Sequence, residues 1–250
     1  MNDFSIPLVH LEEVLEQIYT IPVNEAFDLA LDNKDCGCPI CTLYRKLQDD
    51  ELDIILGASM MEPDIRIKTN ESGFCLTHYN MMMKRRRMLG IGLMMESHLD
   101  EVKKKLNGPV VFGNKRTAAL NALDKLNCDC YVCGRIDKNL SAMIATTVYL
   151  WETDMAFRDK FKAQPYFCLP HYHAMVDYAS KKMHKHYYPE FYDVANKIQN
   201  DYLDTLKNDV SWFCKKFDYR YDEEPWYNSR DSLKRSIAFL SGAPGEEENK

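Results

Sequence analysis

The chain is poor in the residues that build turns. It has ten glycines and ten prolines among its 250 residues. Loop-rich all-β proteins need many such residues at their turns, whereas helices largely exclude both from their interiors. The low count therefore predicts an all-α protein with long helices.

Long hydrophobic runs are missing as well. The longest apolar run, LGIGLMM at residues 89–95, is far shorter than the roughly 20 residues that a membrane-spanning helix needs. The opening residues, MNDFSIPLVHLEE, lack the basic start and the apolar stretch of a signal peptide. We therefore expect a cytoplasmic protein without a membrane partner.

Familiar catalytic and nucleotide-binding motifs do not occur. The sequence contains no His-Glu-x-x-His, no Gly-x-x-x-x-Gly-Lys, no Gly-x-Gly-x-x-Gly and no Glu-x-x-His of the di-iron type. The net charge of −6 disfavours a general nucleic-acid binder. The four consecutive cations at residues 84–87 would project in different directions from a helix. We therefore expect them to be solvated rather than to form an anion-binding or nucleic-acid-binding patch. These absences favour a non-enzymatic role without excluding an enzyme.

Cysteine, in contrast, is plentiful, and it occurs twice in the same order. CGCPIC at 36–41 and FCLTHY at 74–79 recur as CDCYVC at 128–133 and FCLPHY at 167–172, with shifts of 92 and 93 residues. Five matched metal-type residues predict an internal duplication. We expect an N-terminal helical half at 1–109, a C-terminal half at 110–240 related to it by a pseudo-twofold axis, and a disordered tail at 241–250.

The spacing of these residues is typical of zinc. A Cys-x-x-Cys pair at a helix start and a Cys-x-x-His pair at another supply the tetrahedral Cys₃His set that zinc prefers. We expect each half to hold one zinc with its own four residues, giving two zincs per chain. The predicted ligands are Cys38, Cys41, Cys75 and His78 in the first half, and Cys130, Cys133, Cys168 and His171 in the second.

Two alternatives to this ligand assignment stay open. Cys36 and Cys128 are left over, and either could be an alternative ligand or a redox-active thiol. Each half also has four cysteines, which is enough for an iron–sulfur cluster. The histidine retained in both copies favours zinc, because a four-cysteine cluster does not need it.

Helical periodicity gives the expected elements around these motifs. We expect a turn at Ile21-Pro22, an extended segment at 64–69, and one long helix over 76–106. An apolar stripe along that helix predicts a core-facing side, and Gly92 on it would let another backbone come close. The stripe consists of Met81, Met88, Met95, Leu99, Val102 and Leu106.

Several stretches spread over the chain resemble a family of uncharacterised bacterial proteins, common in clostridia and classed as a domain of unknown function. The resemblance lies in YTIPVNEAF at 19–27, CPIC at 38–41, MEPDIRI at 61–67, GFCLTHY at 73–79, LGIGLMMESHL at 89–99 and KFDYRYDEEPW at 216–226. The second cluster departs from the Cys-Pro-x-Cys form, because Tyr131 stands where Pro39 stands in the first. The resemblance implies a cytoplasmic protein of an anaerobe or facultative anaerobe, and no activity.

Together these patterns predict a zinc-binding helical protein. Closed four-ligand sites are structural in zinc proteins, so we expect them to support a binding or scaffold role toward a protein or small-molecule partner. The alternatives are a thiol or zinc redox or metal sensor, and an iron–sulfur or metal-dependent enzyme.

Overall fold

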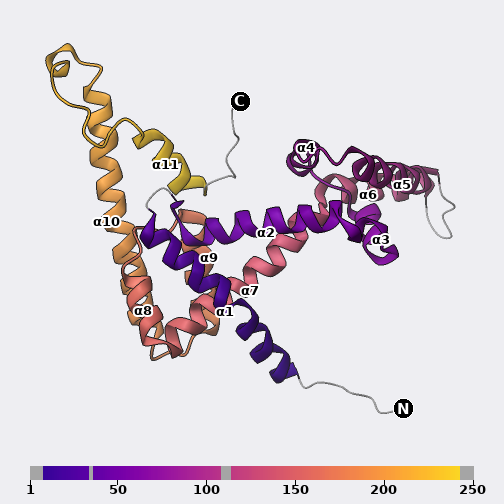
Figure 1. Ribbon diagram of the computed structural model, residues 1–250, viewed down its shortest axis with the longest axis horizontal. Helices are drawn as coiled ribbons and strands as arrows, with labels where there is room; N and C mark the ends of the chain where they lie inside the picture. Colours follow the sequence, from indigo (N-terminus) through magenta and orange to yellow (C-terminus); the bar gives the residue numbers. More distant parts are fainter. Residues whose placement is uncertain (1–7, 34–35, 108–113, 243–250) are drawn as a thin grey trace. The chain divides into compact units, whose positions relative to one another are not determined.

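The computed structural model describes residues 8–33, 36–107 and 114–242 (Figure 1). These three stretches contain eleven α-helices, two short 3-10 helices and no strand, which confirms the predicted all-α class. The α-helices are α1 (Leu8–Asp32), α2 (Pro39–Leu56), α3 (Pro63–Ser72), α4 (Leu76–Lys84), α5 (Met88–Asn107), α6 (Lys115–Cys128), α7 (Tyr131–Thr153), α8 (Met155–Lys162), α9 (Leu169–Lys182), α10 (Tyr188–Lys215) and α11 (Ser232–Ser241).

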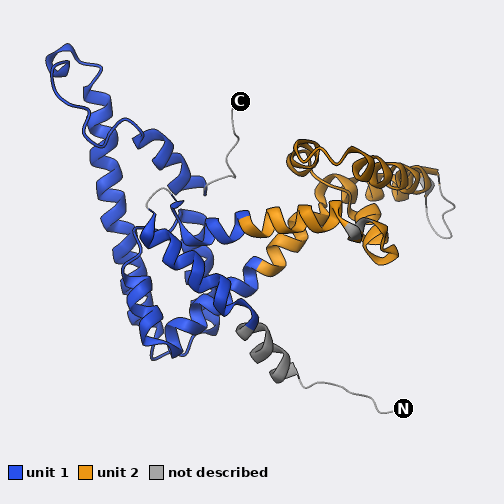
Figure 2. Ribbon diagram, viewed as in Figure 1, with its two compact units in different colours: residues 1–45, 140–250 blue, residues 46–139 orange. Residues whose placement is uncertain are grey.

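The chain divides into two compact units (Figure 2). Unit 1 consists of residues 1–45 and 140–250, and unit 2 consists of residues 46–139. This division differs from the expected halves at 1–109 and 110–240, because α2 and α7 each begin in one unit and end in the other. Of the expected tail at 241–250, residues from 243 onward lie outside the described part of the chain.

Unit 1 is built around a cluster of buried aromatic rings. The ring of Phe27 in α1 lies 4.9 Å from that of Phe157 in α8, and Phe161 lies 4.7 Å from Phe167. Trp151 of α7 meets Phe161 edge-on at 4.9 Å. Such pairs add to the free energy that burial of the rings already contributes. The cluster holds α1, α7 and α8 against the residue that directly precedes Cys168.

Unit 2 is a smaller helical body in which α5 packs against α3 and α6. Its buried side chains include Leu52 of α2, Met82 of α4, and Ile91 and Met94 of α5. Arg85, directly after α4, donates hydrogen bonds to the carboxylates of two α2 residues, Asp49 and Asp53. Apolar burial and this double ion pair therefore fix α4 relative to α2.

Two local predictions are wrong. Ile21-Pro22 does not form a turn, since α1 runs through Pro22 without interruption. The proline costs the helix roughly 3 kcal/mol, but the next turns bury Val23 and Phe27 completely, and this packing outweighs the cost. Residues 64–69 are helical rather than extended, because Pro63 starts α3 at the one helical position that suits proline.

The long helix expected over residues 76–106 is divided. α4 ends at Lys84 and α5 begins at Met88, and Arg86 between them has a φ of 57° in the left-handed region. The predicted apolar stripe also faces outward on α5, where Leu99 is 66% exposed. The opposite face of α5 supplies the buried residues, because α3 and α6 pack there.

The two halves of the sequence nevertheless place their helices in the same order. In α1–α5 and again in α6–α10, one helix precedes the cysteine pair, a long helix begins within that pair, and a short helix follows. A helix then begins directly after the cysteine of the Cys-x-x-His pair, and a long helix ends the series. The order supports a duplication, while the pseudo-twofold relation between the halves stays a prediction.

Candidate metal centres

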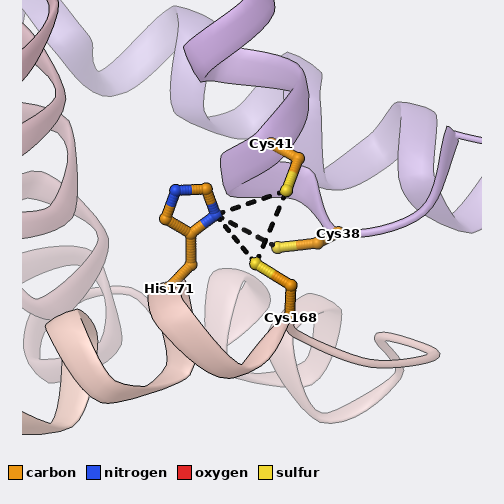
Figure 3. Close-up of side chains that lie close together, drawn as sticks. All are labelled: Cys38, Cys41, Cys168 and His171. Atoms are coloured by element: carbon orange, nitrogen blue, oxygen red, sulfur yellow. Dashed lines mark hydrogen bonds between the residues drawn. The ribbon is translucent and has the colours of Figure 1, made fainter. Parts of the chain in front are cut away.

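Four side chains of unit 1 converge on one point (Figure 3). The Nδ1 atom of His171 lies 3.8 Å from the sulfur of Cys38, 3.4 Å from that of Cys41 and 3.1 Å from that of Cys168. The sulfurs of Cys41 and Cys168 are 3.5 Å apart. All three cysteines are buried, and none of them forms a disulfide. We call this group site 1.

Local backbone structure places these side chains. Cys38 and Cys41 flank the start of α2, and Cys168 is the N-cap of α9, which carries His171 in its first turn. Gly37 turns the chain into Cys38 with a φ of +72°, and a Cβ there would come within 2.7 Å of the Tyr166 hydroxyl. Helix starts present unpaired N–H groups and a positive dipole end, which stabilise thiolates.

A second group of four lies in unit 2. The Nδ1 atom of His78 lies 3.2 Å from the sulfur of Cys75, 3.3 Å from that of Cys130 and 3.5 Å from that of Cys133. The sulfurs of Cys75 and Cys133 are 3.9 Å apart. Cys75 and Cys133 are half-buried, whereas His78 is buried. We call this group site 2.

Both groups fit a tetrahedral metal ion. With zinc–sulfur bonds of about 2.3 Å and a zinc–nitrogen bond of about 2.0 Å, tetrahedral geometry puts sulfurs about 3.8 Å apart and sulfur about 3.5 Å from nitrogen. The observed distances lie close to these values. A disulfide would need sulfurs about 2.05 Å apart, so the thiols are not paired as disulfides. The two clusters can therefore each hold a metal ion.

The ligands pair differently from the expectation. Each half was expected to close its own site, but the Cys-x-x-Cys pair of each half lies with the Cys-x-x-His pair of the other. Helix lengths explain this outcome. At 1.5 Å per residue, α2 is about 27 Å long, whereas α3 is only about 15 Å long. In the second half, α7 is about 34 Å long and α8 only about 12 Å.

The departure at Tyr131 has a structural use. Its backbone N–H donates a hydrogen bond of 2.9 Å to the carbonyl of Gly73. Proline has no N–H, so the residue type found at Pro39 could not make this bond. The bond joins the Cys-x-x-Cys segment of site 2 to the segment that leads into Cys75.

His78 has a buried hydrogen-bonding partner that the sequence analysis missed. The Nε2 atom of His78 lies 3.0 Å from the side-chain amide nitrogen of Gln48. Burial lowers the pKa of His78, which keeps the imidazole neutral and able to bind a metal. A metal on Nδ1 leaves the proton on Nε2, and the Gln48 amide, turned over by about 180° about its last bond, would then present its oxygen as the acceptor. Only the helical spacing of Gln48 from buried Leu52 could have indicated that it faces inward.

The thiols of site 1 differ in acidity before any metal binds. Burial raises the pKa of Cys38 well above its ordinary value. Hydrogen bonds from Cys168 and Cys38, in that order of strength, lower the pKa of Cys41. The pKa of Cys168 is raised to about 12, because the neighbouring Cys41 and burial together outweigh a hydrogen bond with Cys38 that lowers it. Metal binding therefore has to displace protons from Cys38 and Cys168.

Gly242 is a second neighbour of the ligands that the sequence analysis missed. It ends α11 with a φ of +81°, and a Cβ there would lie 3.9 Å from the sulfurs of both Cys41 and Cys168. The C-terminal end of α11 therefore lies against site 1. No sequence pattern indicates this contact, since residue 242 lies within the expected tail.

The remaining candidates lie outside both groups. Cys36 is half-buried and Cys128 is exposed, and neither belongs to the four ligands of a site. Arg45 donates a hydrogen bond to the carbonyl of Cys36, which helps to hold the loop that leads into site 1. In the basic run, Arg85 is engaged with two α2 carboxylates rather than free for an anion.

The chain belongs to the family of unknown function DUF6062, whose model matches residues 14–247. The resemblance predicted from the sequence motifs is thus confirmed at the level of the family. No curated protein and no solved structure gave a match. Among the described helices, none is long and apolar enough to cross a membrane.

Proposed function

We propose that this protein is a zinc-stabilised helical scaffold with two structural Cys₃His sites and a role in binding a partner. The observation that carries the proposal is the complete ligand set of each site. Three sulfurs and one imidazole nitrogen lie within 4.8 Å of one another in each group. A zinc ion with four protein ligands has no position for water or substrate, which is typical of structural sites.

The placement of the ligands supports the structural role. Site 1 joins the start of α2 to the start of α9, residues separated by 127 to 133 positions in sequence. Site 2 joins the start of α4 to the start of α7 across 52 to 58 positions. Structural zinc contributes on the order of 10 kcal/mol to folding, comparable to the whole net stability of a domain. Each zinc would thus fix one unit.

Metal analysis of protein purified without oxygen tests the identity of the ion. We expect two zincs per chain and no absorption in the visible range. Iron with acid-labile sulfide and a brown colour would overturn the zinc assignment. The same sample, treated with a chelator, should lose helical circular dichroism if the metals are structural. A chelated protein that keeps its full spectrum and melting temperature would contradict the structural role.

A thiol-based redox sensor is the second candidate, and the exposure of site 2 favours it. Cys128 is exposed and lies two residues before Cys130, while Cys75 and Cys133 are half-buried. One hydrogen peroxide molecule oxidises two such thiolates to a disulfide. The peroxide takes up the two electrons from the sulfurs and two protons from solvent and becomes two waters. The metal then leaves the site, because two of its ligands are lost. Zinc release measured with a chromogenic chelator at low peroxide would support the sensor, and retention of both zincs would exclude it.

A further inference from the structure

The outward face of α5 carries a regular apolar row. Its members recur at spacings of four, three, four, three and four residues, which is the heptad pattern by which two helices pack against each other. Leu99 in the middle of the row is 66% exposed, and Met88 at its beginning is also exposed. We call this row the α5 seam; it consists of Met88, Gly92, Met95, Leu99, Val102 and Leu106.

The fold of unit 2 leaves the seam exposed except at Val102, which is half-buried. Gly90, Ile91 and Met94 are the buried residues of α5, on the face that packs against α3 and α6. A Cβ added at Gly92 would meet no atom within 4 Å, so nothing in the described chain approaches the seam there. A row of exposed apolar side chains on a helix whose other face is packed is typical of an interaction site.

The charges beside the seam select the partner. Glu96 and Lys103 are exposed, lie seven residues apart on the same flank, and make no ion pair in the described chain. In an antiparallel pair of identical helices, the same flanks face each other, so Glu96 of one copy faces Lys103 of the other. A parallel pair would instead bring Lys103 of one copy near Lys105 of the other on both sides of the contact, which is unfavourable.

We propose that the α5 seam binds a second copy of this chain, with the two α5 helices antiparallel. Leu99 of each copy packs against Val102 of the other, and Met95 packs against Leu106 of the other. Two Glu96–Lys103 pairs flank this contact. The proposal goes beyond the scaffold role, and it does not depend on which metal the sites hold.

The contact spans about two heptads on each helix. An interface of this length falls at the low end of specific interfaces, which bury about 1,000 Å² in total. We therefore expect a dimer that dissociates on dilution rather than a permanent one.

Sedimentation velocity of the metal-loaded full chain over a series of concentrations tests the proposal. The wild type should change from monomer to dimer as concentration rises. Leu99→Glu should weaken the dimer by about a hundredfold or more, because each dimer contains the change twice. Leu120→Glu is the matched control, since Leu120 of α6 in the same unit is 60% exposed and lies outside the seam. Circular dichroism and metal content show that each variant is folded and loaded.

Charge reversal tests the antiparallel register. Glu96→Lys and Lys103→Glu should each weaken the dimer by about tenfold, since each breaks two ion pairs and creates like-charge contacts. The double variant restores both pairs and should recover wild-type affinity. A wild type that stays monomeric at every concentration would overturn the proposal, as would equal effects of Leu99→Glu and Leu120→Glu. Failure of the double variant to recover would overturn the antiparallel register.

Discussion

Site 1 and site 2 have the same ligand types and nearly the same distances, yet they occupy different surroundings. The cysteines of site 1 are buried beside the aromatic core of unit 1, where Phe167 directly precedes Cys168. In site 2 the histidine is the buried ligand, and Cys75 and Cys133 are half-buried. The same coordination chemistry therefore serves a packed core in one unit and a partly solvated junction in the other.

Burial, rather than loop length, should decide which site contributes more to stability. Site 1 closes a segment of about 130 residues and site 2 one of about 55. Loop-closure entropy grows by about 0.6 kcal/mol per doubling, so the difference in length is worth only about 0.8 kcal/mol. Loss of packing around a buried ligand costs several times more. We therefore expect the two sites to respond unequally to the same substitution.

The largest effect should come from removing one thiol at each site. Cys168→Ser should remove one metal and destabilise unit 1 by several kcal/mol, because the aromatic core next to Cys168 loosens as well. Cys133→Ser should also remove one metal, but faster exchange of backbone amide hydrogens should be confined mainly to residues 46–139. Metal analysis and hydrogen exchange measured by mass spectrometry distinguish these results.

Cys214→Ser serves as the control for this pair of variants, since Cys214 is exposed and belongs to neither site. It should keep both metals and the wild-type exchange pattern. If Cys168→Ser and Cys133→Ser destabilise the chain equally, burial is not what distinguishes the sites.

The pH dependence of metal affinity should show how many protons the thiols of site 1 release when the metal binds. Cys38 and Cys168 have raised pKa values, the latter about 12, so both are protonated at neutral pH without metal. Hydrogen bonds from Cys168 and Cys38 lower the pKa of Cys41, which favours its thiolate before metal binds. Each metal bound then releases two protons, and the affinity should fall about a hundredfold for each pH unit of decrease.

Competition with a chromogenic chelator at several pH values, in the Cys133→Ser background that retains only site 1, measures this slope. The raised pKa values keep both protons in place throughout the neutral range, so the slope should stay constant there. If the logarithm of the affinity changes by three per pH unit, Cys41 is also protonated before the metal binds. If it does not change with pH, all three cysteines are thiolates before the metal binds.

Gln48 should set the affinity of site 2 alone. Gln48→Leu removes the acceptor for the Nε2 proton of His78 and should weaken metal binding at site 2 by about 10- to 100-fold. Gln48→Glu keeps an acceptor at that position and should retain the affinity. Site 1 in the same molecule is the internal control, since its affinity should not change. Equal losses in the two variants would show that volume, not hydrogen bonding, is what Gln48 supplies.

The sequence predicted the elements of both sites but not their pairing. Spacing alone identifies a Cys-x-x-Cys pair, because two sulfurs three residues apart at a helix start face one point. It cannot identify the partner pair, which depends on how far the intervening helices carry the chain. The lengths of α2 and α3 determine that distance. The sequence analysis could not use them, because it predicted an extended segment at 64–69 in place of α3. The stripe on α5 failed for a related reason, since periodicity marks an apolar face without saying whether the same chain covers it.

Tyr131 offers the finest comparison between the sites, because it occupies the position of Pro39. Tyr131→Pro would make the second cluster match the Cys-Pro-x-Cys form of the first, and pattern alone predicts an improvement. The structure predicts the opposite, since the variant loses the N–H that donates to Gly73. The loss should lower the free energy of unfolding of unit 2 by about 1 kcal/mol and weaken metal binding at site 2 about fivefold.

Tyr131→Ala is the matched control, since it removes the same ring but keeps the N–H. Chemical denaturation and chelator competition on both variants give the difference that belongs to the hydrogen bond. If Tyr131→Pro is as stable as Tyr131→Ala, the favourable φ of proline at a helix start offsets the lost bond. The two cysteine pairs would then be interchangeable, and the difference between the sites would reside in burial and in Gln48 alone.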